Sequence, residues 1–199
     1  MVAAVLFDLY DTLIHLRCNR NPYMHLCRKV KSGNRLRESM IVEASTLVDI
    51  CTYLDVKPPD DIVKLQIELE ADIQSAVTFP NAVSTLKALK EKDIRIAVVS
   101  NVATPCKLPF YRLGLDKLCD TIIFSCELGI AKPDPGIYEA ALSSLGIDGR
   151  DTIMVGDSLR SDVVGPSACG IKGILIDRRD NCTNRDAINS LKGVEQYLL

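Results

Sequence analysis

Short runs of consecutive apolar residues alternate along the chain with amphipathic helical patterns. The apolar runs are rich in β-branched residues and end in polar or turn-forming residues; they cover residues 2–7, 95–100, 121–125, 152–156 and 172–177. Helical periodicity covers residues 81–92, 134–145 and 185–198. Strands of a parallel sheet are buried on both faces and therefore read as continuous apolar runs. We predict an α/β fold, a doubly wound, Rossmann-like parallel sheet with helices on both faces.

Residues 14–79 interrupt this alternation, because they carry no strand pattern. Apolar residues recur at steps of three and four over residues 36–54 and over residues 60–77. Asp60 or Asp61 suits the cap of the second helix, and a pair of prolines marks the turn before it. We therefore predict a small helical insert over residues 14–79, placed after the first strand of a core formed by residues 1–13 and 80–199.

Composition excludes several classes of protein. The chain has 199 residues, of which 47% are hydrophobic and 25% charged, as in a globular domain. A net charge of −2 argues against a nucleic-acid or membrane-surface partner. No apolar run approaches the roughly 20 residues of a membrane helix, and the apolar start runs directly into Asp8, unlike a signal peptide. We expect a cytoplasmic protein, and the sequence leaves its oligomeric state open.

The chain has eight cysteines and no Cys-x-x-Cys pair. We interpret most of them as small buried side chains in a reducing compartment. An intracellular disulfide, of the kind found in thermophiles, is the competing interpretation.

Chemically active side chains follow four of the predicted strands. In chain order they are Asp8 with Asp11 and Thr12, then Ser100 with Asn101, then Lys132, and finally Asp157 with Asp162. Ligands of open parallel sheets bind beyond the carboxyl ends of the strands. One acid at a strand end means little, but this ordered combination of carboxylate, hydroxyl, lysine and second carboxylate is specific, and we expect the four ends to share one site.

These groups suit a displacement in which the Asp8 carboxylate attacks a phosphorus or carbon centre and forms a covalent intermediate. Lys132 and Mg²⁺ would neutralise charge on a transferred phosphoryl group. Mg²⁺ prefers carboxylate oxygens, so Asp8 and Asp157 are candidate ligands. Ser100 and the Asn101 amide are candidate hydrogen-bond donors to the phosphoryl oxygens.

Four ordered motifs resemble those of the haloacid dehalogenase (HAD) superfamily. They read FDLYDTL around Asp8, VVSN ending at Asn101, KPDP from Lys132, and VGDSLRSD ending at Asp162. The helical insert is similar to the α-helical, C1-type cap of that superfamily, which closes over the active site. The resemblance covers essentially the whole chain and implies a hydrolase.

The resemblance also implies a role for each matching residue. Asp8 would be the nucleophile, Ser100 and Thr12 would bind substrate, and Lys132 would steady Asp8 and the phosphoryl oxygens. Mg²⁺ would be held by Asp8, Asp157 and the main-chain carbonyl of Tyr10. Asp162 and Asp11 would be supporting residues.

Tyr10 departs from the phosphatase pattern. Phosphatases of the superfamily carry a second aspartate two residues after the nucleophile, as general acid and base. Here that position is Tyr10, and Asp11 stands one residue later. The superfamily's dehalogenases also carry tyrosine there, but they replace the metal-binding aspartate of the fourth motif, which this chain keeps as Asp157.

We therefore expect a Mg²⁺-dependent phosphatase of a small phosphorylated metabolite. Two alternatives stay open: a 2-haloacid dehalogenase-type hydrolase, and a catalytically weak protein that binds phosphorylated ligands.

A basic stretch extends from Arg17 to Arg37, with seven basic residues and no acidic one. One interpretation is a rim on the insert that attracts a small anionic substrate, with Arg35 and Arg37 as candidate binding residues. The competing interpretation is a solvated helix face.

Overall fold

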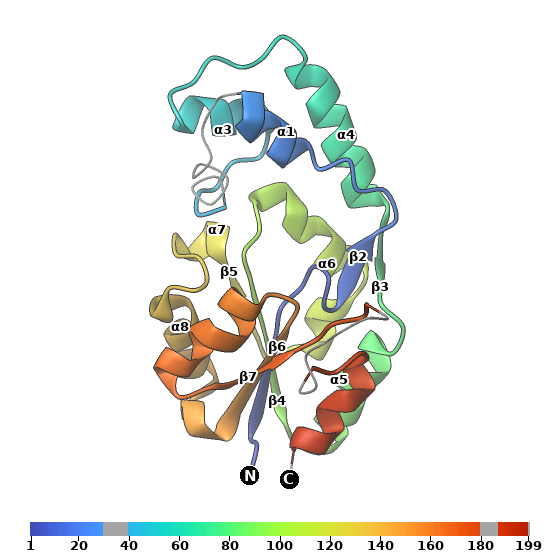
Figure 1. Ribbon diagram of the computed structural model, residues 1–199, viewed down its shortest axis with the longest axis vertical. Helices are drawn as coiled ribbons and strands as arrows, with labels where there is room; N and C mark the ends of the chain where they lie inside the picture. The colour runs from blue at the N-terminus through green and yellow to red at the C-terminus, as the bar shows by residue number, and fades with distance from the viewer. Residues whose placement is uncertain (30–39, 180–186, 199) are drawn as a thin grey trace.

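The structure is a computed structural model that describes residues 1–29, 40–179 and 187–198. A sheet flanked by helices forms the lower part of the molecule, and a smaller group of helices lies above it (Figure 1). The two chain ends lie together at the base, far from the upper helices. The carboxyl ends of the strands point toward the space between the two parts.

The core sheet has five parallel strands, in the order β5-β4-β1-β6-β7. Their bounds are β1 (Ala4–Phe7), β4 (Arg95–Ser100), β5 (Thr121–Phe124), β6 (Thr152–Gly156) and β7 (Lys172–Leu175). The central strand β1 pairs with β4 and β6, so that Ala4 lies opposite both Arg95 and Thr152. The predicted doubly wound parallel sheet and all five of its strands are confirmed.

Alternate residues of β1 face opposite layers of the core, as the pleat of a strand requires. Val5 and Phe7 pack in a cluster with α5 (Ala82–Glu91), whereas Leu6 packs in a second cluster with α8 (Pro135–Leu145). Both helices were predicted. The strand is buried on both faces, which explains its unbroken apolar sequence.

The upper part consists of α1 (Pro22–Lys29), α3 (Leu47–Tyr53) and α4 (Ile62–Gln74) around a hydrophobic cluster that also includes Ala103, from the core segment after β4. Leu47 and Leu69 are fully or almost fully buried there. Thr46 begins α3 with a capping box, in which its side chain accepts from the Asp49 amide and Asp49 accepts from the Thr46 amide. These helices form the helical insert.

The prediction that the insert holds no strands is wrong. β2 (Ile14–Leu16) and β3 (Ala76–Thr78) form an antiparallel pair where the chain enters and leaves the insert. Three residues are too few to show strand alternation beside longer helical patterns. Because β3 takes up Ala76 onward, the helix predicted over residues 60–77 is shorter and ends at Gln74.

Two further helical predictions are wrong in part. Residues 40–46 are irregular, and the helix predicted over 36–54 is present in the described residues as α3 alone. The helix predicted over 185–198 appears as a 3₁₀ helix, η6 (Leu191–Tyr197), which begins after Ser190. Ile188 pairs instead with Ile176. The Ile188 amide donates to the Leu175 carbonyl and the Ile188 carbonyl accepts from the Asp177 amide, so neither group is available to a longer helix. The predicted domain limits at residues 13 and 80 stay predictions.

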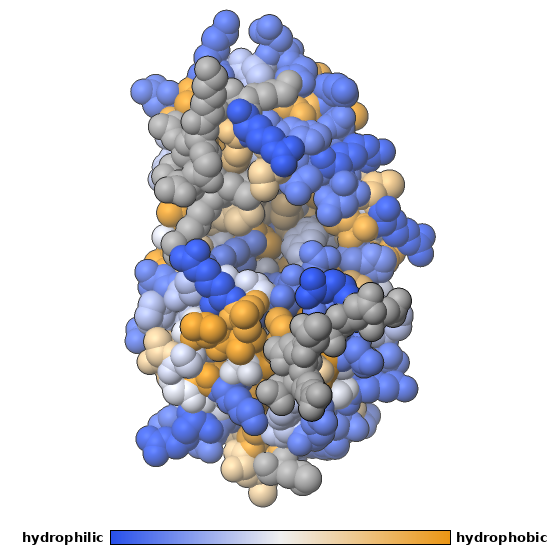
Figure 2. All heavy atoms as spheres, in the orientation of Figure 1, coloured by the Kyte–Doolittle hydropathy of each residue, from blue (hydrophilic) through white to orange (hydrophobic). Residues whose placement is uncertain are grey.

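The seven cysteines of the described residues are free thiols. None of the helices described is both long and apolar enough to cross a membrane. An apolar patch lies on one face of the core (Figure 2), over η4 (Leu159–Val164), whose Leu159 and Val164 are largely exposed.

Candidate active site

Asp8 lies directly after β1, where its amide donates to the carbonyl oxygen of Val155 in β6. Its carboxylate oxygen Oδ1 accepts hydrogen bonds from Ser100 Oγ (2.9 Å) and Lys132 Nζ (2.7 Å). The carboxylate is almost buried, with 8% of the residue exposed. The structure thus brings together three of the strand-end residues that the sequence singled out.

Lys132 links two carboxylates, because its Nζ also contacts Asp162 Oδ1 at 2.6 Å. Burial alone would lower the pKa of Lys132, but the charges of Asp8 and Asp162 outweigh it and raise that pKa. The lysine is therefore held as a cation. Two charge-assisted hydrogen bonds fix its position at the floor of the site.

Asn101 holds the main chain of Lys132 with its side-chain amide. The Lys132 amide donates to Asn101 Oδ1 at 2.7 Å, and Asn101 Nδ2 donates to the Lys132 carbonyl oxygen at 2.9 Å. The sequence predicted a substrate-binding role for the Asn101 backbone amide. It did not predict that the side chain positions the lysine.

Asp162 is buried and lies in the π-helix η4. Its second carboxylate oxygen accepts from the Ser158 amide at 3.0 Å. A Cβ at Gly156 would overlap the Asp162 carboxyl group, so this position needs a glycine. The buried Tyr138 hydroxyl donates to the Ser161 carbonyl and holds η4 to α8.

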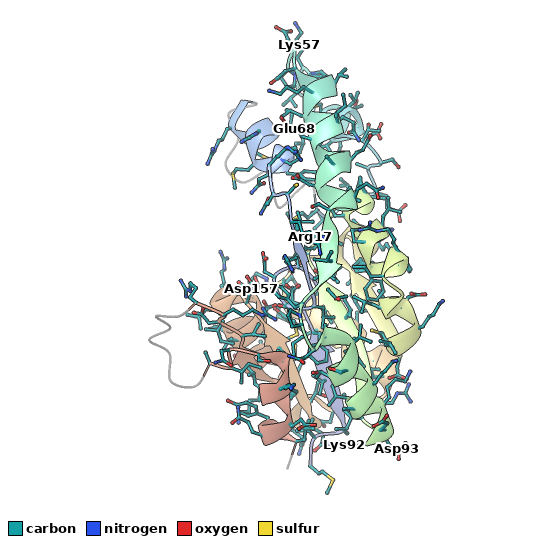
Figure 3. The ribbon with its side chains drawn as sticks, turned by 90° about the vertical axis from the view of Figure 1, so that its right-hand side faces the viewer. Arg17, Lys57, Glu68, Lys92, Asp93 and Asp157 are labelled. Carbon is teal, nitrogen blue, oxygen red and sulfur yellow. The ribbon has the colours of Figure 1, made fainter. Side chains whose placement is uncertain are left out.

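Three carboxylates, those of Asp8, Asp157 and Asp162, place oxygens within 4.8 Å of one another. Burial and the charges of Asp8 and Asp162 raise the pKa of Asp157 to about 6. Burial and Asp8 likewise raise the pKa of Asp162 to about 6, against the opposing effect of Lys132. Asp157 lies at the end of the core that faces the helical insert (Figure 3).

This cluster fits a hard divalent cation, which binds carboxylate oxygens and would offset the repulsion between them. Both carboxylate oxygens of Asp162 already accept hydrogen bonds, one from Lys132 and the other from the Ser158 amide, whereas Lys132 and Ser100 both bond to Oδ1 of Asp8. Asp8 and Asp157 are consequently the better-suited ligands of the three.

Tyr10 extends from the turn that follows β1. Its hydroxyl donates to the main-chain carbonyl of Cys106 at 2.9 Å. Burial, followed by the proximity of Cys106, raises the pKa of the Tyr10 phenol well above its ordinary value. The phenol therefore stays protonated, and it uses its single proton on the backbone.

Asp11 has a positive φ of 56°, which few residues other than glycine adopt. Its amide donates to the Ile14 carbonyl at 2.8 Å, and the Ile14 amide donates to Leu9 at 3.0 Å, closing a tight turn. Burial and Asp8 raise the pKa of Asp11. The adjacent Thr12 is fully buried, and its hydroxyl has no hydrogen-bond partner among the described residues.

Arg178 was missed by the sequence analysis. Its Nη1 donates to the Asp11 carbonyl oxygen (2.6 Å) and its Nη2 to that of Thr12 (2.8 Å). It stands three residues after β7 ends, so its place beyond a fifth strand end is visible in the sequence, although its main-chain partners are not.

The insert contacts the core beside the site. Ser125 Oγ donates to the Met40 carbonyl at 2.5 Å, and the Ala44 amide donates to Thr104 Oγ1 at 3.1 Å. The candidate binding residues Arg35 and Arg37 lie outside the described residues. Arg20, in the same basic stretch, pairs with Asp72 of α4, so part of that positive charge is neutralised within the insert.

Comparisons with known proteins identify the family of the chain. A family model for haloacid dehalogenase-like hydrolases matches residues 2–170. Glyceraldehyde 3-phosphate phosphatase of Pyrococcus abyssi is 32% identical over 197 residues, covering 87% of this chain and 81% of that protein. The enzyme of the same name from Methanothermobacter thermautotrophicus is 34% identical over 55% of this chain, and ribulose-1,5-bisphosphate 5-phosphatase of Halopiger xanaduensis is 30% identical over 61%. The chain aligns with about half the length of these last two relatives, 49% and 51%.

Solved structures share the fold over nearly the whole chain. A HAD phosphatase from Thermococcus onnurineus superposes with a TM-score of 0.69, covering 100% of this chain and 98% of its own, at 22% identity. A structure described as a dehalogenase gives a TM-score of 0.71 over 99% of this chain and 97% of its own, also at 22% identity. With the motifs, the sheet order and the family match in agreement, the chain belongs to the haloacid dehalogenase-like hydrolases.

Proposed function

We propose that this hydrolase is a Mg²⁺-dependent phosphatase of a small phosphorylated metabolite, with Asp8 as its nucleophile. The observation that carries the proposal is the environment of the Asp8 carboxylate. One of its oxygens is fixed by Lys132 and Ser100, and a second carboxylate, Asp157, lies beside it with a raised pKa. A fixed carboxylate next to a lysine cation and a cation-binding pair suits transfer of a phosphoryl group.

The proposed reaction has two displacements at phosphorus. In the first, Asp8 attacks the phosphorus of the ester, the bond to the leaving oxygen breaks, and an aspartyl phosphate forms. In the second, water attacks the same phosphorus, releases phosphate and restores the carboxylate. Ser100 and Lys132 orient the carboxylate before attack, and Lys132 offsets charge on the phosphoryl oxygens.

Asp8, Asp157 and the Tyr10 carbonyl are the groups proposed to hold Mg²⁺. When bound, the ion would supply further positive charge against the phosphoryl oxygens. It would also offset the negative charge of Asp8, which raises the pKa of Asp157 in its absence.

Tyr10 restricts the kind of substrate. Its hydroxyl donates to the Cys106 carbonyl, and its high pKa prevents it from accepting a proton at neutral pH. A leaving group that needs no protonation suffers least from the missing acid. The proposal therefore favours acyl and aryl phosphates, whose leaving groups are stable anions, over alkyl phosphates.

A 2-haloacid dehalogenase is the alternative that Tyr10 keeps open. The fold does not separate the two activities, since a phosphatase and a dehalogenase superpose almost equally well. The relatives compared above are phosphatases by name, and Asp157 lies in a carboxylate cluster of the kind that suits a metal ion. Both observations favour the phosphatase.

A substrate panel tests the proposal. Glyceraldehyde 3-phosphate, ribulose 1,5-bisphosphate, an aryl phosphate and acetyl phosphate would be compared with 2-haloacids, each with and without Mg²⁺. We expect release of phosphate that depends on Mg²⁺. Halide release without Mg²⁺, with no phosphate ester cleaved, would establish the dehalogenase instead. Binding of phosphate with neither reaction would support a ligand-binding protein.

A further inference from the structure

We propose that Arg178 is a positioning residue, which locks the turn behind the nucleophile to the connection between core and insert. The inference rests on the proposed function for its kinetic consequence, but its structural content is independent of the substrate. Nothing in the four motifs includes this residue, which lies in the chain segment after β7.

The guanidinium group of Arg178 bridges the main chain of the nucleophile turn. Its two terminal nitrogens donate to the consecutive carbonyls of Asp11 and Thr12, at 2.6 and 2.8 Å. A planar fork with two donors is matched to such a pair of acceptors, whereas a lysine ammonium is not. These bonds restrain Asp11, which has a positive φ and lies three positions after Asp8.

The same guanidinium group lies over the ring of Phe79, with its Cζ 3.7 Å from the ring centroid. Phe79 directly follows β3, the strand by which the chain leaves the insert. The Phe79 amide donates to Leu13 at 2.9 Å, and its ring lies 4.6 Å from that of His15 in β2. Arg178 therefore contacts the turn that leads into β2 and the residue that follows β3.

Arg178 itself projects from a restrained segment. The Ile176 amide donates to Gly156 at 2.9 Å, and the Asp177 amide donates to Ile188 at 2.8 Å. Figure 1 shows the chain running from β7 toward the side of the core where β2 and β3 meet it. Arg178 consequently ties the nucleophile turn and Phe79, the residue after β3, to the segment that follows the edge strand β7.

Two other features mark Arg178 as more than a surface charge. It is half-buried, and burial lowers its pKa against the opposing charges of Asp11 and Asp157. Its neighbour Arg179 is different: its side chain is 83% exposed and pairs with Asp177. The two arginines thus form a matched pair, of which Arg178 alone contacts the nucleophile turn and Phe79 in the described residues.

The test compares Arg178→Met, Arg178→Lys and the control Arg179→Met. Hydrogen exchange of the peptide over residues 9–16 reports the turn directly, and hydrolysis of p-nitrophenyl phosphate with Mg²⁺ reports the nucleophile. We expect Arg178→Met to exchange faster in this peptide and to lose about 10- to 100-fold in kcat with little change in KM, as small displacements of catalytic groups do. Arg178→Lys should recover part of the loss, and Arg179→Met should match the wild type.

A second pair of variants separates loss of the Arg178 contacts from a general loss of folding. Phe79→Leu keeps the hydrogen bonds of Arg178 but removes the stacked ring. If Arg178 acts through its contact with the Phe79 ring, the two substitutions are coupled. Adding Phe79→Leu to Arg178→Lys should then cost less in kcat than Phe79→Leu costs alone.

Unchanged exchange of the 9–16 peptide in Arg178→Met, or equal losses of kcat in Arg178→Met and Arg179→Met, would overturn the inference. If wild-type protein cleaves no phosphate ester, the proposed function fails, but the exchange experiment still decides the role of Arg178.

Discussion

The hydroxyl of Tyr10 donates its proton to the main-chain carbonyl of Cys106, 2.9 Å away. Cys106 lies in η1 (Thr104–Lys107), the 3₁₀ helix that follows β4 and the Ser100 motif. The residue that replaces the usual acid and base is thus part of the contact between two active-site loops. The Tyr10 hydroxyl is committed to this contact and stays protonated, so the proposed reaction has no proton acceptor at this position.

Replacing Tyr10 tests that interpretation. Tyr10→Asp restores a carboxylate at the position of the family's acid and base, which is worth roughly 10²–10⁴ in rate where it acts. Without a base for water, the wild type should hydrolyse the aspartyl phosphate slowly and so release the aryl alcohol in an initial burst. We expect Tyr10→Asp to show faster steady turnover and no burst. Tyr10→Phe, which removes only the hydroxyl, should leave the pH profile of kcat unchanged; a changed profile would show that the phenol takes part in proton transfer.

Asp11→Asn tests whether Asp11 substitutes for the missing aspartate. Asp11 belongs to a turn that its own amide and the Arg178 guanidinium fix through the backbone. We expect a change in kcat much smaller than the hundredfold or more lost with a general base. Brisk hydrolysis of alkyl phosphates by the wild type, abolished in Asp11→Asn, would assign the proton transfer to Asp11.

Asp157 makes stability depend on pH in the metal-free protein. Its pKa rises from 3.8 to about 6 on folding, so the folded state binds more protons than the unfolded chain between these values. Its stabilising contribution is complete below the lower value and is lost as the pH rises through about 6. We expect Asp157→Asn to have a larger free energy of unfolding than the wild type at about pH 8 without metal, measured by urea unfolding.

Mg²⁺ provides the control for this prediction. The ion should stabilise the wild type at the higher pH and have a much smaller effect on Asp157→Asn, because binding to the folded state alone adds to its stability. Equal stabilisation of both proteins by Mg²⁺ would remove Asp157 from the proposed ligands.

Lys132 is expected to be a large contributor to stability as well as to catalysis. Its side chain is 2% exposed and bridges Asp8 and Asp162, the latter 1% exposed. Lys132→Met leaves two buried carboxylates without their cation, and removing one partner of such a pair costs about 3–5 kcal/mol. Urea unfolding measures this loss in the free energy of unfolding.

The pair Lys92–Glu195 is the matched control, since both side chains are more than half exposed. Lys92→Met should cost about 1 kcal/mol or less. Comparable losses in the two variants would mean that the buried pair contributes no more than a surface one.

The strand-end residues were predictable because the apolar runs mark where each strand stops. Asp8 and Asp157 follow their runs immediately, Ser100 is the last residue of its run, and a parallel sheet brings its carboxyl ends to one edge. Asp157 then meets Asp8 because β1 and β6 are neighbours in the sheet. The shared edge follows from the fold class, which the alternation of strands and helices reveals, whereas the pairing of Asp8 with Asp157 follows from the strand order.

Other features depend on contacts that no sequence spacing encodes. Arg178 acts on main-chain carbonyls, which every residue carries, so the residue types at 11 and 12 do not reveal it. The Asn101 side chain holds Lys132 across 31 positions of the chain. The short strands β2 and β3 fall below the length at which periodicity distinguishes strand from helix.

In the proposed reaction Asp8 carries the phosphoryl group as an aspartyl phosphate. The most direct measurement is to mix the protein with a radiolabelled aryl phosphate and Mg²⁺, quench in acid, and map the label by peptide analysis. We predict a labelled peptide containing Asp8, a label that disappears in Asp8→Asn and in the absence of Mg²⁺, and a slow return to unlabelled protein. Phosphate release with no label on Asp8 would contradict this mechanism, as would an unlabelled protein that releases halide from a 2-haloacid without Mg²⁺.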